Sequence, residues 1–378
     1  MSSGTVVKRG ENSWRLKYDI SPDPISGERR TRYFTFRGSK RDAQTRLAKL
    51  ISEADDGIDA APASETFGTF IDKWMTDTIK PAVRASTYEG YEAIVYKHVI
   101  PALGRIKLKD IRATHIQTYY SDKAKGGLAS QTIVHHHRRI FQALKFAYLA
   151  RLIPFNPAEA VKPPKVQREE IVVLSGEELR TLLDGLEGRR FWSIVFLAAC
   201  TGMRRSEILG LRWCDLDIET SHLAVNRALE QTKEFGLQIV PPKTKSSRRR
   251  ITLPAPAIEM LKRLRLRQDE EFLALGIGRD NDRHVFTRKD GEWYSPRSIS
   301  KEFQRSIADM DITQITFHGL RHTHITHLLR DNVNLKVVSA RAGHASVSIT
   351  LDIYGHLIDG METSAADAVE RWFGSENE

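Results

Sequence analysis

The chain has 378 residues and a mass of 43.0 kDa, enough for two or three domains, and its net charge of +10 favours a polyanionic partner without identifying it. It contains only two cysteines, Cys200 and Cys214, which excludes a disulfide-scaffolded secreted protein. The most apolar run, residues 191–200, is too short to cross a bilayer, and no apolar signal segment opens the chain, so we expect a cytoplasmic protein without a membrane partner.

Residues 1–57 predict a small β-sheet followed by a helix. The segments 4–20 and 29–36 favour two or three strands joined by turns, and Ser39 with Asp42 forms a capping box at the start of a helix. A basic sheet can lie in the major groove of DNA, although a basic sheet that is merely solvated is the alternative. The strands carry cations interleaved with aromatic residues: Lys8, Arg9, Trp14, Arg15, Lys17, Tyr18, Arg29, Arg30, Arg32, Tyr33, Phe34 and Arg37.

Residues 58–65 predict a linker, and residues 66–153 predict a module of four helices. Ser86 with Glu89 is a second candidate capping box. The run "HHHRR" (135–139) suggests a zinc site, but the absence of nearby cysteines favours a basic helix face with one or two buried imidazoles. The four prolines of residues 154–170 then predict an extended connector.

Residues 171–378 form the largest block, which the pattern divides into a long helix over 177–200, several short strands and further helices. The predicted fold is therefore multidomain and mainly α. It combines a small N-terminal β-sheet plus helix, a four-helix domain, and a mostly helical third domain with a small sheet.

Two stretches of this block concentrate cations. In "TGMRRSEILGLRW", Gly202 ends one helix and Arg204 begins the next, where a cation opposes the helix dipole unless an anion lies nearby. Strand-like residues flank "KTKSSRR", which predicts a hairpin tip where Lys243 and Lys245 could reach over a substrate, or a solvated turn.

Two further stretches supply imidazoles and a phenol. A helix that starts near His318 in "FHGLRHTHITHLLRD" places Arg321 and His322 on one face with it. In "AGHASVSITLDIYGH", Ser346 predicts the N-cap of a helix that has His344 before it and Tyr354 at its end. Taken alone, Tyr354 is typical of an aromatic residue packed under a terminal helix.

Together these stretches supply arginines, a lysine, histidines and a tyrosine, without clustered carboxylates or a P-loop. This argues against metal-assisted hydrolysis and ATP-driven work. Cations and imidazoles suit an anionic phosphoryl-transfer transition state, and a phenol attacks phosphorus well only when a base or cations favour its deprotonation.

The four stretches, in this order, closely resemble the motifs of the tyrosine recombinases, the phage integrase family. The resemblance places the first catalytic arginine on Arg204, with Glu207 as its acidic partner. It places His318 and Arg321 in the site and leaves His322 as a neighbour. It puts the remaining roles on His344, on the nucleophile Tyr354, and on Lys243, with Lys245 as second choice.

The resemblance implies a domain order of an arm-type DNA-binding domain (1–57), a linker (58–65), a SAM-like core-binding domain (66–153), a linker (154–170) and a catalytic domain with a tail (171–378). It implies double-stranded DNA with core-type and arm-type sites as partner, a homotetramer, and no metal or cofactor. A host DNA-bending protein and an excisionase are further partners that it allows. A tail stripe of Ala365, Val369, Trp372 and Phe373 suits docking on a neighbouring protomer or on its own domain.

Three other functions are alternatives to an integrase. A chromosome-dimer resolvase shares the chemistry, but such proteins typically lack the basic block at 1–57. A non-catalytic DNA-binding protein would have no use for Arg204, Arg321, His344 and Tyr354 together. A type IB topoisomerase uses similar residues, but the motif "HGLRH" and the helical module favour recombination.

Overall fold

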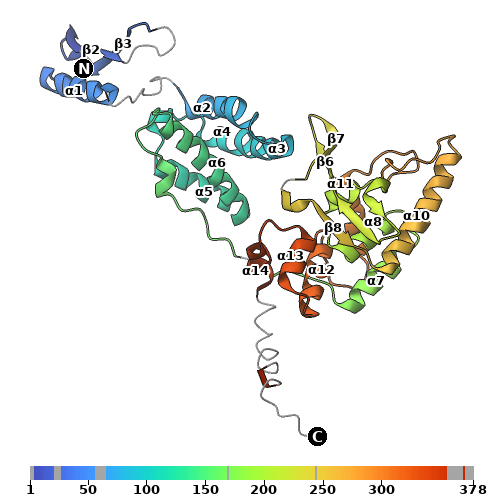
Figure 1. Ribbon diagram of the computed structural model, residues 1–378. Helices are drawn as coiled ribbons and strands as arrows, with labels where there is room; N and C mark the ends of the chain where they lie inside the picture. The colour runs from blue at the N-terminus through green and yellow to red at the C-terminus, as the bar shows by residue number, and fades with distance from the viewer. Residues whose placement is uncertain are drawn as a thin grey trace. The chain divides into compact units, whose positions relative to one another are not determined.

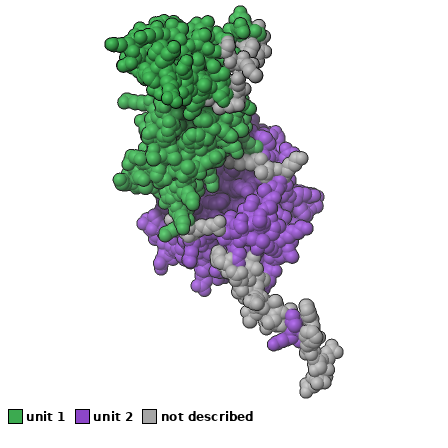
Figure 2. Space-filling model, turned by 90° about the vertical axis from the view of Figure 1, so that its left-hand side faces the viewer, with its two compact units in different colours: residues 1–168 green, residues 169–378 purple. Residues whose placement is uncertain are grey.

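The computed structural model describes residues 4–20, 27–55, 65–167, 170–242, 245–355 and 369–370, with the side chains of residues 53–55 and 245 excepted. The chain divides into two compact units, residues 1–168 and residues 169–378, which Figure 2 colours separately. Among the described residues, none of the helices is long and apolar enough to span a membrane.

The N-terminal part is the predicted three-stranded sheet with one helix (Figure 1). Strands β1 (Gly4–Gly10), β2 (Ser13–Ile20) and β3 (Arg30–Arg37) are antiparallel in that order, and α1 spans Lys40–Asp55. The N-cap half of the predicted capping box is confirmed, since the Ser39 hydroxyl accepts a hydrogen bond from the backbone N–H of Asp42 at 3.2 Å, and the Asp42 carboxylate accepts from the Ser39 hydroxyl at 2.7 Å. The apolar stripe of α1 packs with β2 in a small core of Leu16, Ala43, Leu47 and Leu50.

The second part of unit 1 has the four predicted helical stretches. They are α2 with the π-helix η1 (Phe67–Lys73, Trp74–Ile79), α3 with η2 and α4 (Ala85–Ile94, Val95–Val99, Ile100–Leu103), α5 (Ala113–Lys125) and α6 (Ser130–Leu149), with a short 3₁₀ turn η3 (Leu108–Asp110) before α5. The second capping box was wrong, because α3 is capped by Arg84 and Ser86 lies inside the helix. The 3₁₀ helix η4 (Pro157–Ala160) follows α6. The buried Ala158 and Val161 belong to the hydrophobic core that the four helical stretches share.

The histidine run of α6 has the structural role that the sequence predicted. His136 is fully buried, and its Nδ1 lies 2.8 Å from the hydroxyl of Tyr119. His137 lies on the same helix with Nδ1 2.9 Å from the hydroxyl of Tyr120. Burial, followed by the charges of His98 and Lys123, lowers the pKa of His136 to about 4.

Buried imidazoles make stability depend on pH. Burial lowers the pKa of His284 in unit 2 to about 4 as well, helped by the charges of Arg212 and Arg227. Between pH 6.5 and about 4 the unfolded chain binds protons that folded His136 and His284 do not. The free energy of unfolding therefore decreases as the pH is lowered from 6.5 to about 4. Urea unfolding at pH 7.5, 5.5 and 4.5 should show this slope, at most roughly 3 kcal/mol per imidazole. A His284→Asn variant with an unchanged slope would contradict the assignment for that residue.

Unit 2 opens with two helices where the sequence predicted one over 177–200. Helix α7 (Gly176–Leu186) ends before a turn in which Gly188 has φ +80°, and α8 (Trp192–Thr201) follows. The remaining helices of unit 2 are α9 (Arg205–Leu209), η5 (Trp213–Asp215), η6 (Lys245–Ser247), α10 (Ala255–Leu273), α11 (Pro296–Ile307), α12 (Gly319–Arg330), α13 (Leu335–Ala342) and α14 (Val347–Tyr354).

The strands of unit 2 form two small antiparallel sheets. One sheet has the order β4 (Leu216–Asp217), β5 (His222–Val225), β8 (Arg249–Thr252), and the other pairs β6 (Ala228–Thr232) with β7 (Gly236–Val240). The predicted hairpin at "KTKSSRR" is therefore wrong, because the strands on its two sides pair with other partners. Strand β7 before the segment and strand β8 after it belong to different sheets.

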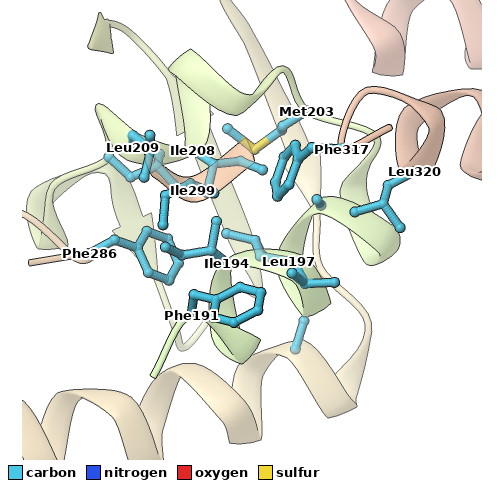
Figure 3. Packing of buried hydrophobic residues seen from close by; sticks show 14 of the residues in the cluster. Phe191, Ile194, Leu197, Met203, Ile208, Leu209, Phe286, Ile299, Phe317 and Leu320 are labelled. Carbon is cyan, nitrogen blue, oxygen red and sulfur yellow. The ribbon is translucent and has the colours of Figure 1, made fainter. Parts of the chain in front are cut away.

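The main hydrophobic core of unit 2 surrounds α8, and several of its residues are sequence neighbours of candidate site residues. Figure 3 shows Met203, Phe317 and Leu320 among the side chains gathered at this core. Each of these three lies next to a polar site candidate: Arg204, His318 and Arg321 respectively. Burying one side chain thus fixes the position of its neighbour, and a tightly packed core resists small displacements.

Candidate active site

Arg204 is placed by the junction between α8 and α9. Gly202 ends α8 in the left-handed conformation with φ +64°, and Arg204 is the N-cap of α9. The anion that the sequence required at this position is Glu207, whose carboxylate receives the Arg204 side chain at 2.8 Å and the Arg204 backbone N–H at 3.0 Å.

Glu207 joins Arg204 to a second arginine. Its side chain is almost completely buried and also accepts a hydrogen bond from Arg249 at 2.9 Å. Burial alone would raise the pKa of Glu207, but the hydrogen bonds and charges of Arg249 and Arg204 outweigh it and hold the pKa low. Glu207 is therefore an ionised carboxylate held between two guanidinium groups.

Arg321 lies on the first turn of α12 and is 4% exposed. Its Nη1 donates a 2.7 Å hydrogen bond to the carbonyl of Gly202, which is part of the same turn that places Arg204. Burial and the nearby charge of Arg204 lower the pKa of Arg321 to about 10. A guanidinium that is buried beside other cations favours an anion in its surroundings.

His318 is the N-cap of α12, and His322 lies one turn later with its ring edge-on to His318, the centroids 5.0 Å apart. Although His318 is exposed, loss of surrounding solvent in the site and then the charges of His322 and Arg321 lower its pKa to about 4. Burial and the charge of Arg321 also lower the pKa of His322, so both imidazoles are neutral near pH 7.

His344 follows Gly343, the left-handed C-cap of α13 with φ +69°. Arg204 donates a 3.1 Å hydrogen bond to the Gly343 carbonyl, so Arg204 and His344 are held together. The Nδ1 of His344 lies 2.8 Å from the hydroxyl of the buried Thr350. Burial and the charges of Arg321 and Arg204 lower the pKa of His344 to about 4.

Tyr354 ends α14, whose N-cap is Ser346 as predicted. The side chain is 1% exposed, and its hydroxyl lies 2.6 Å from Nδ1 of His322. Burial raises the pKa of Tyr354 to about 12, an effect that the charge of Arg321 opposes. Among the apolar residues of α14, Ile353 is partly buried beside Tyr354 and Ile349 is exposed.

Five of the six candidate residues thus lie in one place. They are Arg204, His318, Arg321, His344 and Tyr354, which come from the starts of α9 and α12, the end of α13 and the end of α14. Lys243 lies outside the described residues, as does the side chain of its alternative, Lys245. A cavity of about 430 Å³ opens beside the site, lined by Arg204, Arg205 and His318 among others.

Sequence reasoning missed Arg249 and Thr350. Arg249 could have been found, because side chains along a strand point to alternate faces. In β8 this places Arg249 on the same inward face as the buried Ile251. Two further contacts depend on how α14 packs: His322 with Tyr354, and His344 with Thr350. No local sequence pattern predicts them.

The charges of this site call for an anionic ligand. The guanidinium groups of Arg204 and Arg249 bond the carboxylate of Glu207, and that of Arg321 lies near enough to feel the charges of Glu207 and Arg204, so three cations share one carboxylate and leave an excess of positive charge. Among the described residues, no group of three or more His, Cys, Asp or Glu side chains is placed to hold a metal ion. Guanidinium groups and neutral imidazoles around a phenol suit a phosphate ester as the ligand.

Comparison with known proteins points the same way. Residues 173–360 match the family model described as "Phage integrase family", and residues 66–124 match that of "Phage integrase, N-terminal SAM-like domain". The chain is 28% identical to a "Tyrosine recombinase XerC-like" protein of Caldanaerobacter subterraneus, over 97% of this chain and 98% of that protein. It is 26% identical to the ICEBs1 integrase of Bacillus subtilis, over 96% of this chain and 99% of that protein.

Among solved structures, the fold is similar to that of the Tn1549 transposon integrase in complex with transposon right end DNA. The TM-score is 0.69 at 21% identity, and the match covers 79% of this chain and 99% of that chain.

Proposed function

Because the chain belongs to the phage integrase family of tyrosine recombinases, we propose that it is a site-specific integrase that uses Tyr354 to cut and rejoin DNA through a 3′-phosphotyrosyl intermediate. This reaction would integrate the genome of a phage or other mobile element into DNA, and in the reverse direction it would excise that genome. The observation that carries this proposal is the convergence of Arg204, Arg321 and His344 at a site that also holds a buried phenol.

The two arginines would bind the scissile phosphate. Arg321 has five N–H donors, and in the described part of the chain its hydrogen bond to Gly202 uses only Nη1, so donors remain for the non-bridging oxygens. The Arg204 side chain is about a third exposed, so part of its guanidinium group is accessible to a phosphate. His344, held through Nδ1 by Thr350, would offer Nε2 to the same phosphate.

Lys243 and His318 are assigned roles in proton transfer. Lys243 would protonate the departing 5′-oxygen, and His318 would act as a general acid or base at the phosphate. Rejoining needs no cofactor, since the phosphotyrosyl bond conserves the free energy of the phosphodiester.

The choice between Lys243 and Lys245 can be tested with a modified leaving group. We expect Lys243→Ala to slow single-turnover cleavage by about 10²-fold or more, and Lys245→Ala to have little effect. A substrate with a 5′-bridging sulfur needs no protonation of its leaving group, because a thiolate leaves far more easily than an alkoxide. It should therefore restore cleavage by Lys243→Ala, and a failure to restore it would remove Lys243 from the acid role.

The proposed DNA contacts extend beyond the active site. The helical module would hold core-type DNA, and the N-terminal sheet would hold arm-type DNA. The sheet supports this because Arg15 lies 4.1 Å over the ring of Tyr33, which is 55% exposed and so presents an aromatic surface backed by a cation. Four copies would act at two paired sites in the cytoplasm, on the nucleoid of a bacterial host, with a DNA-bending protein and an excisionase setting the direction.

The arm-binding role can be tested with point changes in the full chain. The double change Arg15→Ala and Tyr33→Ala should weaken binding to arm-type DNA by at least tenfold and leave binding to core-type DNA unchanged. A matched double change on the helical module's exposed surface, Lys109→Ala and Tyr148→Ala, should spare arm-type binding. Equal arm-type affinity for all three proteins would overturn the assignment.

The integrase function itself can be tested without knowing the attachment sites. Nicked duplexes with randomised centres are incubated with the protein in EDTA and without ATP, and DNA that stays attached after denaturation is sequenced. We expect one core sequence to be enriched and two plasmid copies of it to recombine with conservative joints. Covalent capture without recombination, or recombination that requires ATP or a metal ion, would contradict the proposed function.

A further inference from the structure

The tyrosine hydroxyl has a specific partner in the structure. Tyr354 on α14 meets His322 on α12, with 2.6 Å between the hydroxyl oxygen and Nδ1 and with the two ring centroids 5.8 Å apart. Within the described residues this is the hydrogen bond that the phenol makes. The resemblance had left His322 only as a neighbour of the catalytic residues.

The phenol needs a proton acceptor at this position. Burial raises the pKa of Tyr354 to about 12, so the group is protonated near neutral pH. A protonated phenol oxygen that attacks phosphorus must lose its proton as the new bond forms. The acceptor has to lie within hydrogen-bond reach of the oxygen, and geometry comes before pKa in choosing it.

The other two imidazoles of the site are differently engaged. His344 directs its Nδ1 to the hydroxyl of Thr350. His318 meets His322 edge-on, and no hydrogen bond joins it to Tyr354 among the described residues. His322 is left as the imidazole in contact with the reacting atom.

His322 is also in the right protonation state. Burial and then the charge of Arg321 lower the pKa of His322 below its usual 6.5, so the ring is neutral near pH 7. With its proton on Nε2, a neutral ring presents the Nδ1 lone pair to the phenol, and the hydroxyl donates to it.

We propose that His322 is a catalytic residue that accepts the phenolic proton of Tyr354 during cleavage and returns it during rejoining. This inference rests on the proposed role of Tyr354 as nucleophile. In cleavage the Tyr354 O–H bond breaks, its oxygen bonds to phosphorus, and the proton moves to Nδ1 of His322. The bond from phosphorus to the 5′-oxygen breaks, and that oxygen takes its proton from the general acid. In rejoining, the 5′-hydroxyl gives its proton to the general acid that lost one in cleavage, and its oxygen bonds to phosphorus. The bond from phosphorus to the Tyr354 oxygen breaks, and the imidazolium returns its proton to that oxygen.

The proton moves together with the phosphorus–oxygen bond rather than before it. The phenol holds its proton far more tightly than the imidazole does, so full transfer in the resting site is strongly unfavourable. As the phosphate draws electrons from the phenol oxygen, the oxygen becomes more acidic and the balance shifts toward His322. A neutral base of modest strength in direct contact is well suited to such a coupled step.

A single substitution separates proton transfer from positioning. In His322→Asn, the amide oxygen replaces Nδ1 as hydrogen-bond acceptor but does not take up a proton near neutral pH. A group that only holds the phenol would be replaced well by Asn. We expect His322→Asn instead to slow single-turnover formation of the covalent adduct by about 10²-fold or more, with core-site affinity unchanged as the check on folding.

A 5′-bridging sulfur in the substrate sharpens the test. It removes the need for a general acid but not for a base, so it should fail to restore cleavage by His322→Asn. The matched control is His327→Asn, on the same helix but bonded to the carbonyl of Leu174, which should cleave at the wild-type rate. A wild-type or faster rate for His322→Asn, or its rescue by the sulfur substrate, would overturn the inference.

The same experiment keeps the two proposals apart. Tyr354→Phe is run beside His322→Asn on the same DNA. If Tyr354→Phe still forms the adduct, the proposed nucleophile is wrong. If Tyr354→Phe forms none and His322→Asn forms it at the wild-type rate, the nucleophile stands and the role of His322 fails.

Discussion

Replacement of Arg321 by lysine should slow single-turnover DNA cleavage by about 10²- to 10³-fold, which is the loss expected when one charged donor to a developing oxyanion is misplaced. Arg321 is 4% exposed, and one nitrogen is fixed on the Gly202 carbonyl, so its remaining donors point from a rigid position. A lysine ammonium carries the same charge but cannot bond the carbonyl and a phosphate in the same planar geometry.

The loss should appear in the rate of adduct formation on a nicked core site, measured with protein in excess. Affinity for the DNA should change little, because most of it comes from phosphate contacts elsewhere. Arg190→Lys is the matched control, since Arg190 lies in the same unit and pairs with Glu271 outside the site. Equal cleavage rates for Arg321→Lys and Arg190→Lys would show that Arg321 does not stabilise the transition state.

Replacement of Glu207 by glutamine should destabilise unit 2 by about 3–5 kcal/mol, the usual cost of breaking a buried ion pair from one side. The carboxylate holds Arg249 at 2.9 Å and Arg204 at 2.8 Å, and the Arg249 side chain is only 6% exposed. Glutamine fills the same space but leaves both guanidinium groups without a counter-ion.

Urea unfolding of the full chain, followed by tryptophan fluorescence, measures this effect. Glu271→Gln breaks a partly exposed pair with Arg190, whose side chains are 25% and 31% exposed, and should cost about 1 kcal/mol, because solvent screens such a pair. If Glu207→Gln cost no more than Glu271→Gln, the carboxylate would not be the group that holds the arginines in place.

The candidate site was predictable where its geometry is local. Gly202 and Arg204 could be placed because a glycine that ends one helix and an arginine that caps the next are neighbours in sequence. His318 and Arg321 could be placed on one face because three residues span about one helical turn.

Contacts between distant segments were not predictable in this way. The Glu207 carboxylate meets Arg249 from a strand 42 residues later, and Tyr354 meets His322 through the packing of α14. Periodicity also failed to detect the break between α7 and α8, because apolar residues continue at helical spacing on both sides of Gly188. The hairpin expected at "KTKSSRR" was wrong since strand pairing is set by the whole sheet rather than by the flanking residues.

The role of Tyr354 as nucleophile is tested most directly by mapping the covalent bond between protein and DNA. Wild-type protein is incubated with a nicked core site, the adduct is digested, and the peptide that carries the nucleotide is sequenced by mass spectrometry. We expect a 3′-phosphate bonded to Tyr354 and no adduct with Tyr354→Phe. An adduct on any other residue, or one that persists in Tyr354→Phe, would contradict that role.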